Sequence, residues 1–232
     1  MKFLKRILKR VVVAFFASTI LSVVALRFVP VWFTPLMFIR CYDQLKEGRS
    51  LKMSHHWVSL DNISPSLPTA VMASEDARFL SHHGFDFEAI QTAAKRNREH
   101  PEKQKLGAST ISQQTAKNVF LWPGRSWLRK GLEVYFTGLI ELFWSKQRIM
   151  EVYLNSIETG DGIYGADAVA QEHFQLPAKL LSPAQCALIA ATLPNPRRFS
   201  SREPSQYMLK RQKAILHEMK FVKPLPREGE DK

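Results

Sequence analysis

The sequence contains few cysteines, and this scarcity limits both its covalent and its metal chemistry. Only Cys41 and Cys186 occur among 232 residues, so at most one disulfide can form. We expect two unpaired, small hydrophobic side chains, with a disulfide between them as the alternative. His82 and His83 have no further His or Cys nearby at the spacing of zinc ligands. The sequence also lacks internal repeats and low-complexity blocks.

Acidic residues are also scarce. Asp and Glu number 21 against 33 Lys and Arg, which gives a formal net charge of +12. This surplus indicates an anionic partner, which could be nucleic acid, phospholipid head groups or a phosphorylated substrate. Because 45% of the residues are hydrophobic, the chain can form one well-cored domain with an appendage, but not two large domains.

Charged residues are absent from the run 11–26, which directly follows a basic N-terminus. We predict a transmembrane anchor over residues 11–30 and a cytoplasmic basic tail over 1–10. At about 1.5 Å per residue the uncharged run rises roughly 24 Å, short of a hydrocarbon core of about 30 Å, so flanking residues must close the gap. A cleaved signal peptide is the alternative. Basic residues mark the cytoplasmic side, which places the rest of the chain outside the cytoplasm.

Beyond the anchor we expect a membrane-proximal segment, one domain and a tail. Residues 31–50 begin with an apolar, aromatic stretch interrupted by Pro35, which predicts a segment that rests on the bilayer or docks on the domain. Residues 51–220 read as mostly helical, with short β pieces around "HHWVSL". Residues 221–232 are polar and contain proline, which predicts a flexible tail.

The stretch "MASEDARFL" contains the first candidate for acid–base chemistry. If residues 68–80 form a helix, then Val71, Glu75 and Phe79 share one face, and Glu75 projects from an apolar stripe. A carboxylate there should have a raised pKa, as a general base or acid requires. The alternative is that Glu75 only pairs with Arg78.

Residues 107–121, "GASTISQQTAKNVFL", combine a helical pattern with many uncharged polar side chains. Helical spacing predicts two polar stripes, formed by Ser109, Gln113 and Lys117 and by Thr110, Gln114 and Asn118. Gly107 would lie at the start of the helix, where a residue without a side chain lets the backbone amides approach an anion. A solvent-exposed helix normally carries Lys and Glu rather than Gln, Thr and Asn, and Thr and Asn are weaker helix formers. We therefore interpret these residues as groups that bind a sugar.

The next segment, "RSWLRKGLEVYF", contains a cluster of cations and one carboxylate. Helical spacing brings Glu133 one turn after Arg129 and Lys130, and Arg125 precedes them. Such a cluster would fix cations in space. The alternative is an ordinary surface ion pair, since such pairs occur on many helices.

The order and spacing of these segments resemble the peptidoglycan glycosyltransferase family that polymerises lipid II. The resemblance covers about residues 55–200, and "LPNPRRFS", with no transpeptidase sequence after it, resembles the monofunctional biosynthetic form. The motifs that carry it are Glu75-Asp76 with Phe79, His82, Gly84 and Asp86; "GASTISQQ" with Lys117 and Asn118; Arg129, Lys130 and Glu133; Lys146 with "EVYLN"; and "GIYGADAVAQEHF".

The resemblance implies an all-α, lysozyme-like glycosyltransferase head with a small, membrane-facing jaw lobe, in addition to the N-terminal transmembrane helix. We place the jaw near residues 88–106, where the basic run could equally be a solvated linker. The implied location is the bacterial inner membrane, crossed once, with a cytoplasmic N-terminus and a periplasmic catalytic domain. Implied partners are lipid II, the growing glycan strand and the membrane, with room for other cell-wall synthesis proteins.

The resemblance also implies a mechanism. Glu75 would act as the general base in an inverting displacement that adds lipid II to a glycan carried on undecaprenyl pyrophosphate. Cations would neutralise the leaving pyrophosphate, and Glu133 would hold them or bind Mg²⁺ or Mn²⁺, although the sequence assigns no cofactor with certainty. The implied cations are Lys117, Arg125, Arg129 and Lys130, and the implied sugar- and phosphate-orienting residues are Ser109, Thr110, Gln113, Gln114 and Asn118.

Other classes of protein share some of these features. A lysozyme-like hydrolase or lytic enzyme would use a catalytic Glu, but would not need the basic cluster or the anchor. A membrane scaffold or a nucleic-acid binder would explain the charge alone. The predicted location outside the cytoplasm argues against nucleic acid.

Overall fold

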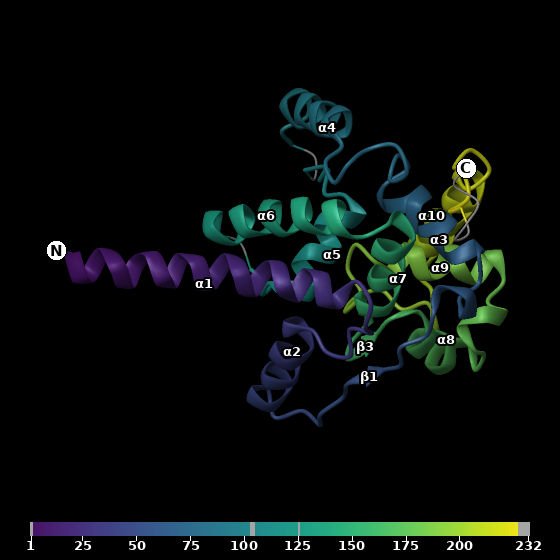
Figure 1. Ribbon diagram of the computed structural model, residues 1–232. Helices are drawn as coiled ribbons and strands as arrows, with labels where there is room; N and C mark the ends of the chain where they lie inside the picture. The colour runs from purple at the N-terminus through teal and green to yellow at the C-terminus, as the bar shows by residue number, and fades with distance from the viewer. Residues whose placement is uncertain (1, 103–104, 125, 227–232) are drawn as a thin grey trace.

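The computed structural model describes residues 2–102, 105–124 and 126–226. Within these ranges the chain is mostly helical, as expected (Figure 1). Arg125, a predicted phosphate-binding residue, and residues 227–232 of the predicted tail lie outside the described residues. The α-helices are α1 (Lys2–Leu26), α2 (Pro35–Lys46), α3 (Ser66–Glu75), α4 (Phe87–Glu99), α5 (Ile111–Phe120), α6 (Trp127–Phe143), α7 (Lys146–Ser156), α8 (Ala166–Phe174), α9 (Pro183–Thr192) and α10 (Gln206–Glu218).

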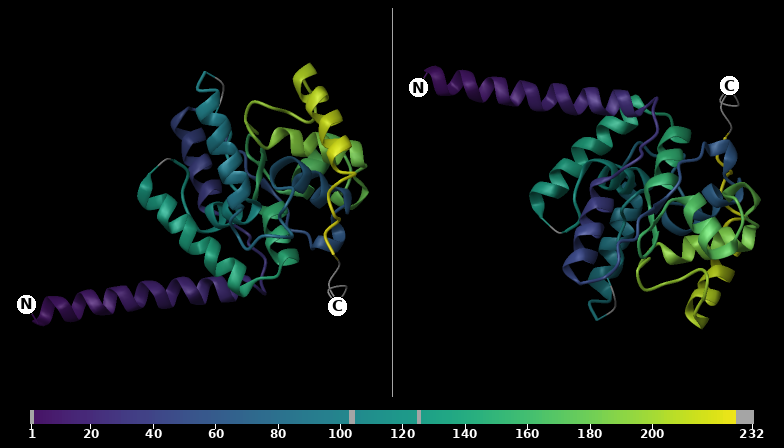
Figure 2. Two further views of the ribbon diagram at one scale, coloured as in Figure 1. Left: turned by 90° about the horizontal axis from the view of Figure 1, so that it is seen from above. Right: turned by 90° about the horizontal axis from the view of Figure 1, so that it is seen from below.

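Helix α1 is long enough to cross a bilayer. It contains 25 residues, which rise about 37 Å and so exceed a hydrocarbon core of about 30 Å. Within the described residues it is the one helix that has both the length and the apolar composition of a membrane span. The helix includes the basic N-terminal residues and ends at Leu26, before the predicted limit of the span at residue 30. Figure 2 shows α1 extending well beyond the rest of the molecule.

The C-terminal half of α1 packs along α6. The hydroxyl groups of Thr19 and Tyr135 are hydrogen-bonded at 2.8 Å, and the Tyr135 ring stacks on Phe15. Trp144 Nε1 donates to the carbonyl of Val23 at 2.8 Å, and the Arg148 guanidinium donates to the carbonyl of the last α1 residue. Since Val23 is fully buried, this part of α1 belongs to the core of the domain.

The segment after α1 has one face in the domain and another in solvent. Val31 and Met37 are buried, so the segment docks on the domain, which was one of the two expectations. Other large apolar side chains of the segment are exposed, namely Phe28, Val29, Trp32, Phe33, Phe38 and Tyr42. These exposed side chains are consistent with contact with the bilayer, the other expectation.

The core of the domain is formed by helices that pack on one another around α5 and α9. Helix α5 lies against α6 and α7, and α9 lies against α3 and α10. Fully buried side chains fill the space between them, including Ile111, Ile140, Ile149, Met150 and Ile189. This packing brings the C-terminal end of α3 close to α5 and α10, although these elements are far apart in sequence.

A small sheet accompanies the helices of this mostly helical fold. Its strands β1 (Ser54–His55), β2 (Glu158–Gly160) and β3 (Ile163–Tyr164) are ordered β1-β3-β2, parallel between β1 and β3 and antiparallel between β3 and β2. β1 confirms the β piece expected around "HHWVSL". Gly162, at φ +68°, turns the chain between β2 and β3, and a Cβ there would lie 2.4 Å from the Lys52 carbonyl oxygen. Two 3-10 helices, η1 (Leu60–Asn62) and η2 (Ala178–Leu180), complete the architecture.

Helix α4 occupies the region predicted as the jaw and projects from the body of the molecule (Figure 1). Asp86 starts it as N-cap by accepting a hydrogen bond from the Ala89 N–H at 2.7 Å. Arg78 binds the same carboxylate and holds the pKa of Asp86 at about 2. Phe87 and Ile90 on α4 are exposed. Residues 103 and 104 of the predicted jaw lie outside the described residues.

Candidate active site

Glu75 is the last residue of α3. The expected helix over residues 68–80 is wrong beyond this point, because the backbone at Asp76 adopts a non-helical φ of −162°. Phe79 therefore lies in the following turn rather than on the helix face of Val71, although both side chains are buried. Arg78, the partner considered for Glu75, binds Asp86 and Glu88 instead.

The Glu75 carboxylate is held by polar side chains from both sides. Gln114 Nε2 donates to Oε2 at 3.1 Å, and the Ser74 hydroxyl donates to Oε1 at 3.4 Å. Burial raises the pKa of Glu75 above its ordinary value, while the Gln114 hydrogen bond and the Arg211 charge oppose this rise. The predicted direction of the pKa shift is confirmed, and a carboxylate of this kind is suited to accept a proton.

Asp76 fixes the end of α3 against the start of α5. Its Oδ2 accepts the backbone N–H of Ile111 at 3.0 Å, and both of its oxygens lie 3.0 Å from His82 Nε2. The first free amide of α5 is thereby satisfied by a residue adjacent to Glu75. This contact sets the distance between Glu75 and the side chains of α5.

A cavity of about 470 Å³ opens beside Glu75. It lies between the end of α3, the first turns of α4 and residues 106–110. Ser109 lines this cavity and is exposed, whereas Thr110, which also lines it, is buried. A volume of this size falls within the range of ligand-binding sites.

Helix α5 is shorter and more buried than the sequence pattern suggested. It begins at Ile111, so Gly107 and Ser109 precede the helix and do not continue its polar stripes. Thr110 and Gln113 form a capping box at its start, and the Thr110 hydroxyl donates to the Gly84 carbonyl at 2.7 Å. Since α5 packs between α6 and α7, it does not present polar groups on most of its surface.

Most polar side chains of α5 therefore have structural partners. Gln113 and Asn118 are buried, Ser112 binds Glu141, and the Thr115 hydroxyl donates to the Ile111 carbonyl. Gln114 is the predicted residue of this helix that contacts Glu75. Uncharged polar residues suit such a helix because buried polar groups must be hydrogen-bonded and buried charges cost more.

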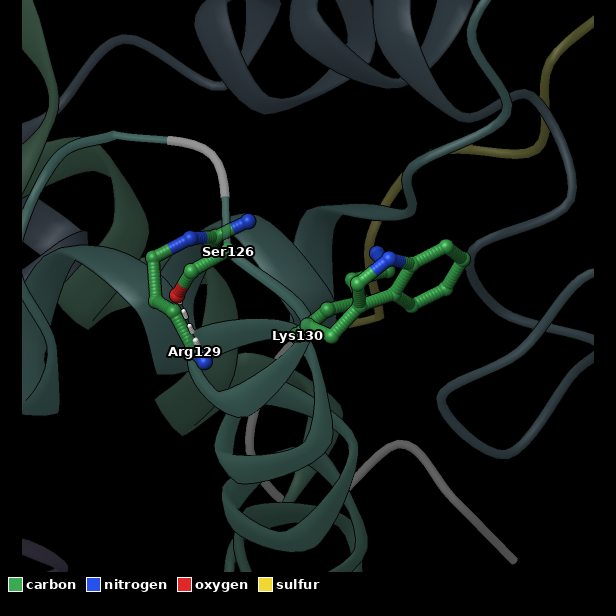
Figure 3. A pocket seen from close by; sticks show the side chains of 4 residues that line it. Ser126, Arg129 and Lys130 are labelled. Atoms are coloured by element: carbon green, nitrogen blue, oxygen red, sulfur yellow. Dashed lines mark hydrogen bonds between the residues drawn. The ribbon is translucent and has the colours of Figure 1, made fainter.

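The predicted cation cluster lies on the first turns of α6. Arg129 Nη1 and Lys130 Nζ donate to the two oxygens of Glu133, each at 2.5 Å, as the spacing predicted. Glu133 is 3% exposed, whereas about two-fifths of the Lys130 side chain is exposed. Figure 3 shows the second pocket, of about 270 Å³, lined by Ser126, Arg129 and Lys130. Lys130 therefore presents positive charge to a solvent-accessible pocket.

Lys117 connects the carboxylate to the cation cluster. It is largely enclosed, and burial lowers its pKa. Its charge interacts with Glu133, Arg129 and Lys130 and also with Glu75. The predicted base and the cation cluster of α6 therefore both interact electrostatically with the same lysine.

Two residues near Glu75 escaped the sequence prediction. Tyr153, which lies in the motif "EVYLN", is buried and donates from its hydroxyl to Gln114 Oε1 at 3.2 Å. Arg211 on α10 donates from Nη2 to the Ser74 hydroxyl at 3.1 Å. No signal in the sequence pointed to Arg211, which lies beyond the region of the resemblance.

Comparison with known proteins shows the family to which the chain belongs. Residues 43–220 match the family described as Transglycosylase. A biosynthetic peptidoglycan transglycosylase of Bacteroides thetaiotaomicron is 62% identical over 95% of this chain and 88% of its own length. Proteins of the same description from Bdellovibrio bacteriovorus and Caulobacter vibrioides are 53% and 51% identical, each over 92% of this chain and over 85% and 92% of their own lengths. The chain therefore belongs to the transglycosylase family, as a biosynthetic peptidoglycan glycosyltransferase.

Proposed function

We propose that the enzyme polymerises lipid II into β-1,4-linked GlcNAc-MurNAc strands and releases undecaprenyl pyrophosphate. The donor is the growing glycan, α-linked through MurNAc to undecaprenyl pyrophosphate, and the acceptor is lipid II. The 4-hydroxyl oxygen of the acceptor GlcNAc bonds to the donor anomeric carbon with inversion, as the bond from that carbon to the pyrophosphate oxygen breaks. The electron pair leaves with pyrophosphate, and the hydroxyl proton goes to a base.

Glu75 is the proposed base. Its carboxylate borders a cavity of sufficient size for part of a sugar chain, and burial raises its pKa toward the working pH. Gln114 holds one oxygen at 3.1 Å and thereby fixes the plane of the carboxylate. Ser109, exposed on the rim of the same cavity, is positioned to bind the sugar.

Lys117, Arg129 and Lys130 are the proposed partners of the leaving pyrophosphate. Because pyrophosphate is already a good leaving group, cations that neutralise its growing charge can replace a general acid. The observation that carries the proposal is that the charge of Lys117 interacts with both Glu75 and the cluster of α6. The hydroxyl of the acceptor can thus lie near the base while the pyrophosphate of the donor lies near the cations.

Glu133 fits the role of a holder of cations better than that of a metal ligand. Both of its oxygens accept hydrogen bonds from Arg129 and Lys130. Across the described ranges, no group of three or more His, Cys, Asp or Glu side chains gathers in a way that could hold a metal ion. We therefore derive no step of the mechanism through Mg²⁺ or Mn²⁺.

The anchor and the exposed aromatic segment would hold this site at the bilayer surface. We propose that α1 crosses the bacterial inner membrane once, with its basic end in the cytoplasm and the domain in the periplasm. The contacts of α1 with Tyr135, Trp144 and Arg148 favour a permanent anchor over a removable leader. The exposed Trp32, Phe33 and Phe38 would then lie at the lipid interface.

The test is turnover of lipid II by the purified full-length protein in detergent. The wild-type protein should form uncross-linked glycan that muramidase digests. Glu75→Gln should fold and bind lipid II but lose polymerisation by about 10² or more, the usual scale for a positioned general base. Full activity of Glu75→Gln would contradict the assignment of the base and leave Glu133 as the next candidate. Cleavage of finished glycan with no use of lipid II would instead identify a hydrolase or lytic enzyme.

A further inference from the structure

The C-terminal helix α10 reaches the candidate base through a short chain of hydrogen bonds. Arg211 Nη2 donates to the Ser74 hydroxyl at 3.1 Å, and that hydroxyl donates to Glu75 Oε1 at 3.4 Å. Helix α10 packs on α3 and α9, so the guanidinium is brought to the end of α3 by the core of the domain. Arg211 lies 137 residues after Ser74 in the sequence.

We propose that Arg211 is a positioning residue that, through Ser74, fixes the orientation and the negative charge of the Glu75 carboxylate. This inference rests on the proposed role of Glu75 as base. Gln114 holds Oε2 from α5, while Ser74 and Arg211 hold Oε1 from the side of α10. With both oxygens held, the carboxylate keeps one plane and one face toward the cavity.

Among the charged groups around Glu75, Arg211 is the cation from α10 that affects its pKa. Asp76, the next residue, raises the pKa of Glu75, whereas the positive charge of Arg211 lowers it. Lys117 from α5 and the Tyr153 hydroxyl from α7 also interact electrostatically with Glu75. Since arginine stays protonated throughout the physiological range, its effect on Glu75 persists at every working pH.

Arg211 is more deeply buried than an arginine that only forms a surface ion pair would need to be. Its Nε is buried without a hydrogen-bond partner among the described residues, so the side chain pays a desolvation cost to reach Ser74. A purely structural arginine would change the stability of the protein when removed. A positioning arginine would also change the pH at which the base becomes active.

The experiment compares the pH dependence of lipid II polymerisation by the full-length protein and four variants. Arg211→Gln removes the charge, Arg211→Lys retains it, and Ser74→Ala breaks the connection. Lys213→Ala, an exposed position on the same helix, is the matched control. We expect the acid limb of kcat to move to higher pH in Arg211→Gln and Ser74→Ala, less so in Arg211→Lys, and not in Lys213→Ala.

At neutral pH, kcat of Arg211→Gln should fall about tenfold, the scale of one charge-assisted hydrogen bond, with little change in KM. If Arg211→Gln does not fold, Arg211→Lys and Ser74→Ala decide the question by the same readout. Folded variants whose acid limb coincides with that of the wild type would overturn the inference.

A titration that does not depend on activity separates this inference from the proposed function. The carboxyl carbon of Glu75 can be followed by NMR in protein labelled with ¹³C-glutamate, and assigned by its absence in Glu75→Gln. Its midpoint should rise in Arg211→Gln and stay constant in Lys213→Ala. If Glu75→Gln were fully active, the proposed base would be wrong, while this titration would still decide whether Arg211 controls Glu75. An unchanged midpoint would refute that control.

Discussion

Gln114 donates a hydrogen bond from its side-chain amide to Glu75 Oε2 at 3.1 Å, and this contact joins α5 to the end of α3. The amide is itself oriented, because the Tyr153 hydroxyl donates to its oxygen at 3.2 Å. Burial raises the pKa of Tyr153 well above 10, so the hydroxyl keeps its proton. Tyr153 therefore determines which end of the Gln114 amide faces the candidate base.

Tyr153→Phe tests this chain of contacts. Loss of the hydroxyl leaves the Gln114 amide free to turn its oxygen toward Glu75, which would repel the carboxylate. We expect the free energy of unfolding to fall by about 1 kcal/mol, as for one hydrogen bond, and kcat to fall several-fold. Thermal melting and lipid II turnover measure the two effects. Wild-type turnover with reduced stability would show that Tyr153 only supports the core.

Glu75→Gln should be more stable than the wild type at neutral pH. Burial raises the pKa of Glu75 in the folded protein above its ordinary value of 4.5, so the folded state binds more protons than the unfolded state between these two values. The free energy of unfolding therefore falls as the pH rises through that window. Glutamine cannot ionise and escapes this loss.

Melting temperatures of the two proteins measured from pH 4 to 8 check the expectation, with the exposed Glu218→Gln as control. The curves for wild type and Glu75→Gln should approach each other at the acid end and separate toward neutral pH. A wild-type protein that gains stability over Glu75→Gln as the pH rises would show that the carboxylate is stabilised by its site.

Lys130→Ala tests the cation cluster. Lys130 presents its charge to the pocket in Figure 3 and shares Glu133 with Arg129. We expect donor turnover to fall at least about tenfold, because a charge-assisted contact to phosphate contributes roughly 1.5 to 3 kcal/mol. Steady-state kinetics of Lys130→Ala and of the exposed control Lys179→Ala measure this. Equal kinetics would identify the cluster as a surface ion pair.

Deletion of residues 1–40 should destabilise the domain as well as detach it from the membrane. The deletion removes the buried side chains of Val23, Val31 and Met37, each worth about 1.5 to 3 kcal/mol when fully buried. Deletion of residues 1–13 leaves these contacts and the Thr19–Tyr135 hydrogen bond intact. Both fragments can be compared by thermal melting and by turnover of detergent-dispersed lipid II.

We expect the shorter deletion to melt near the temperature of the full-length protein and the longer one well below it. On lipid vesicles both should be slower than the full-length protein, since neither has a complete span. Equal melting of the two fragments would mean that the packing of α1 on α6 adds no stability.

Some features of the protein were determined by short stretches of the sequence. The anchor followed from an uncharged run, and the Arg129–Glu133 and Lys130–Glu133 pairs followed from their spacing on one helix. Both features are local in sequence: the anchor is one continuous apolar run, and the paired side chains lie one helical turn apart. The raised pKa of Glu75 was also predicted, although its cause is burial at the end of α3 rather than a helix face shared with Phe79.

Other features depended on contacts between distant segments. The polar pattern of residues 107–121 predicted an exposed, sugar-binding helix, but packing against α6 and α7 buries most of α5, and Thr110 and Gln113 form its capping box. Gln114 lies 39 residues from Glu75, and Arg211 lies 137 residues from Ser74. Periodicity predicts which side of a helix is apolar, but only the tertiary structure decides which helices meet, because that depends on how their apolar faces pack together.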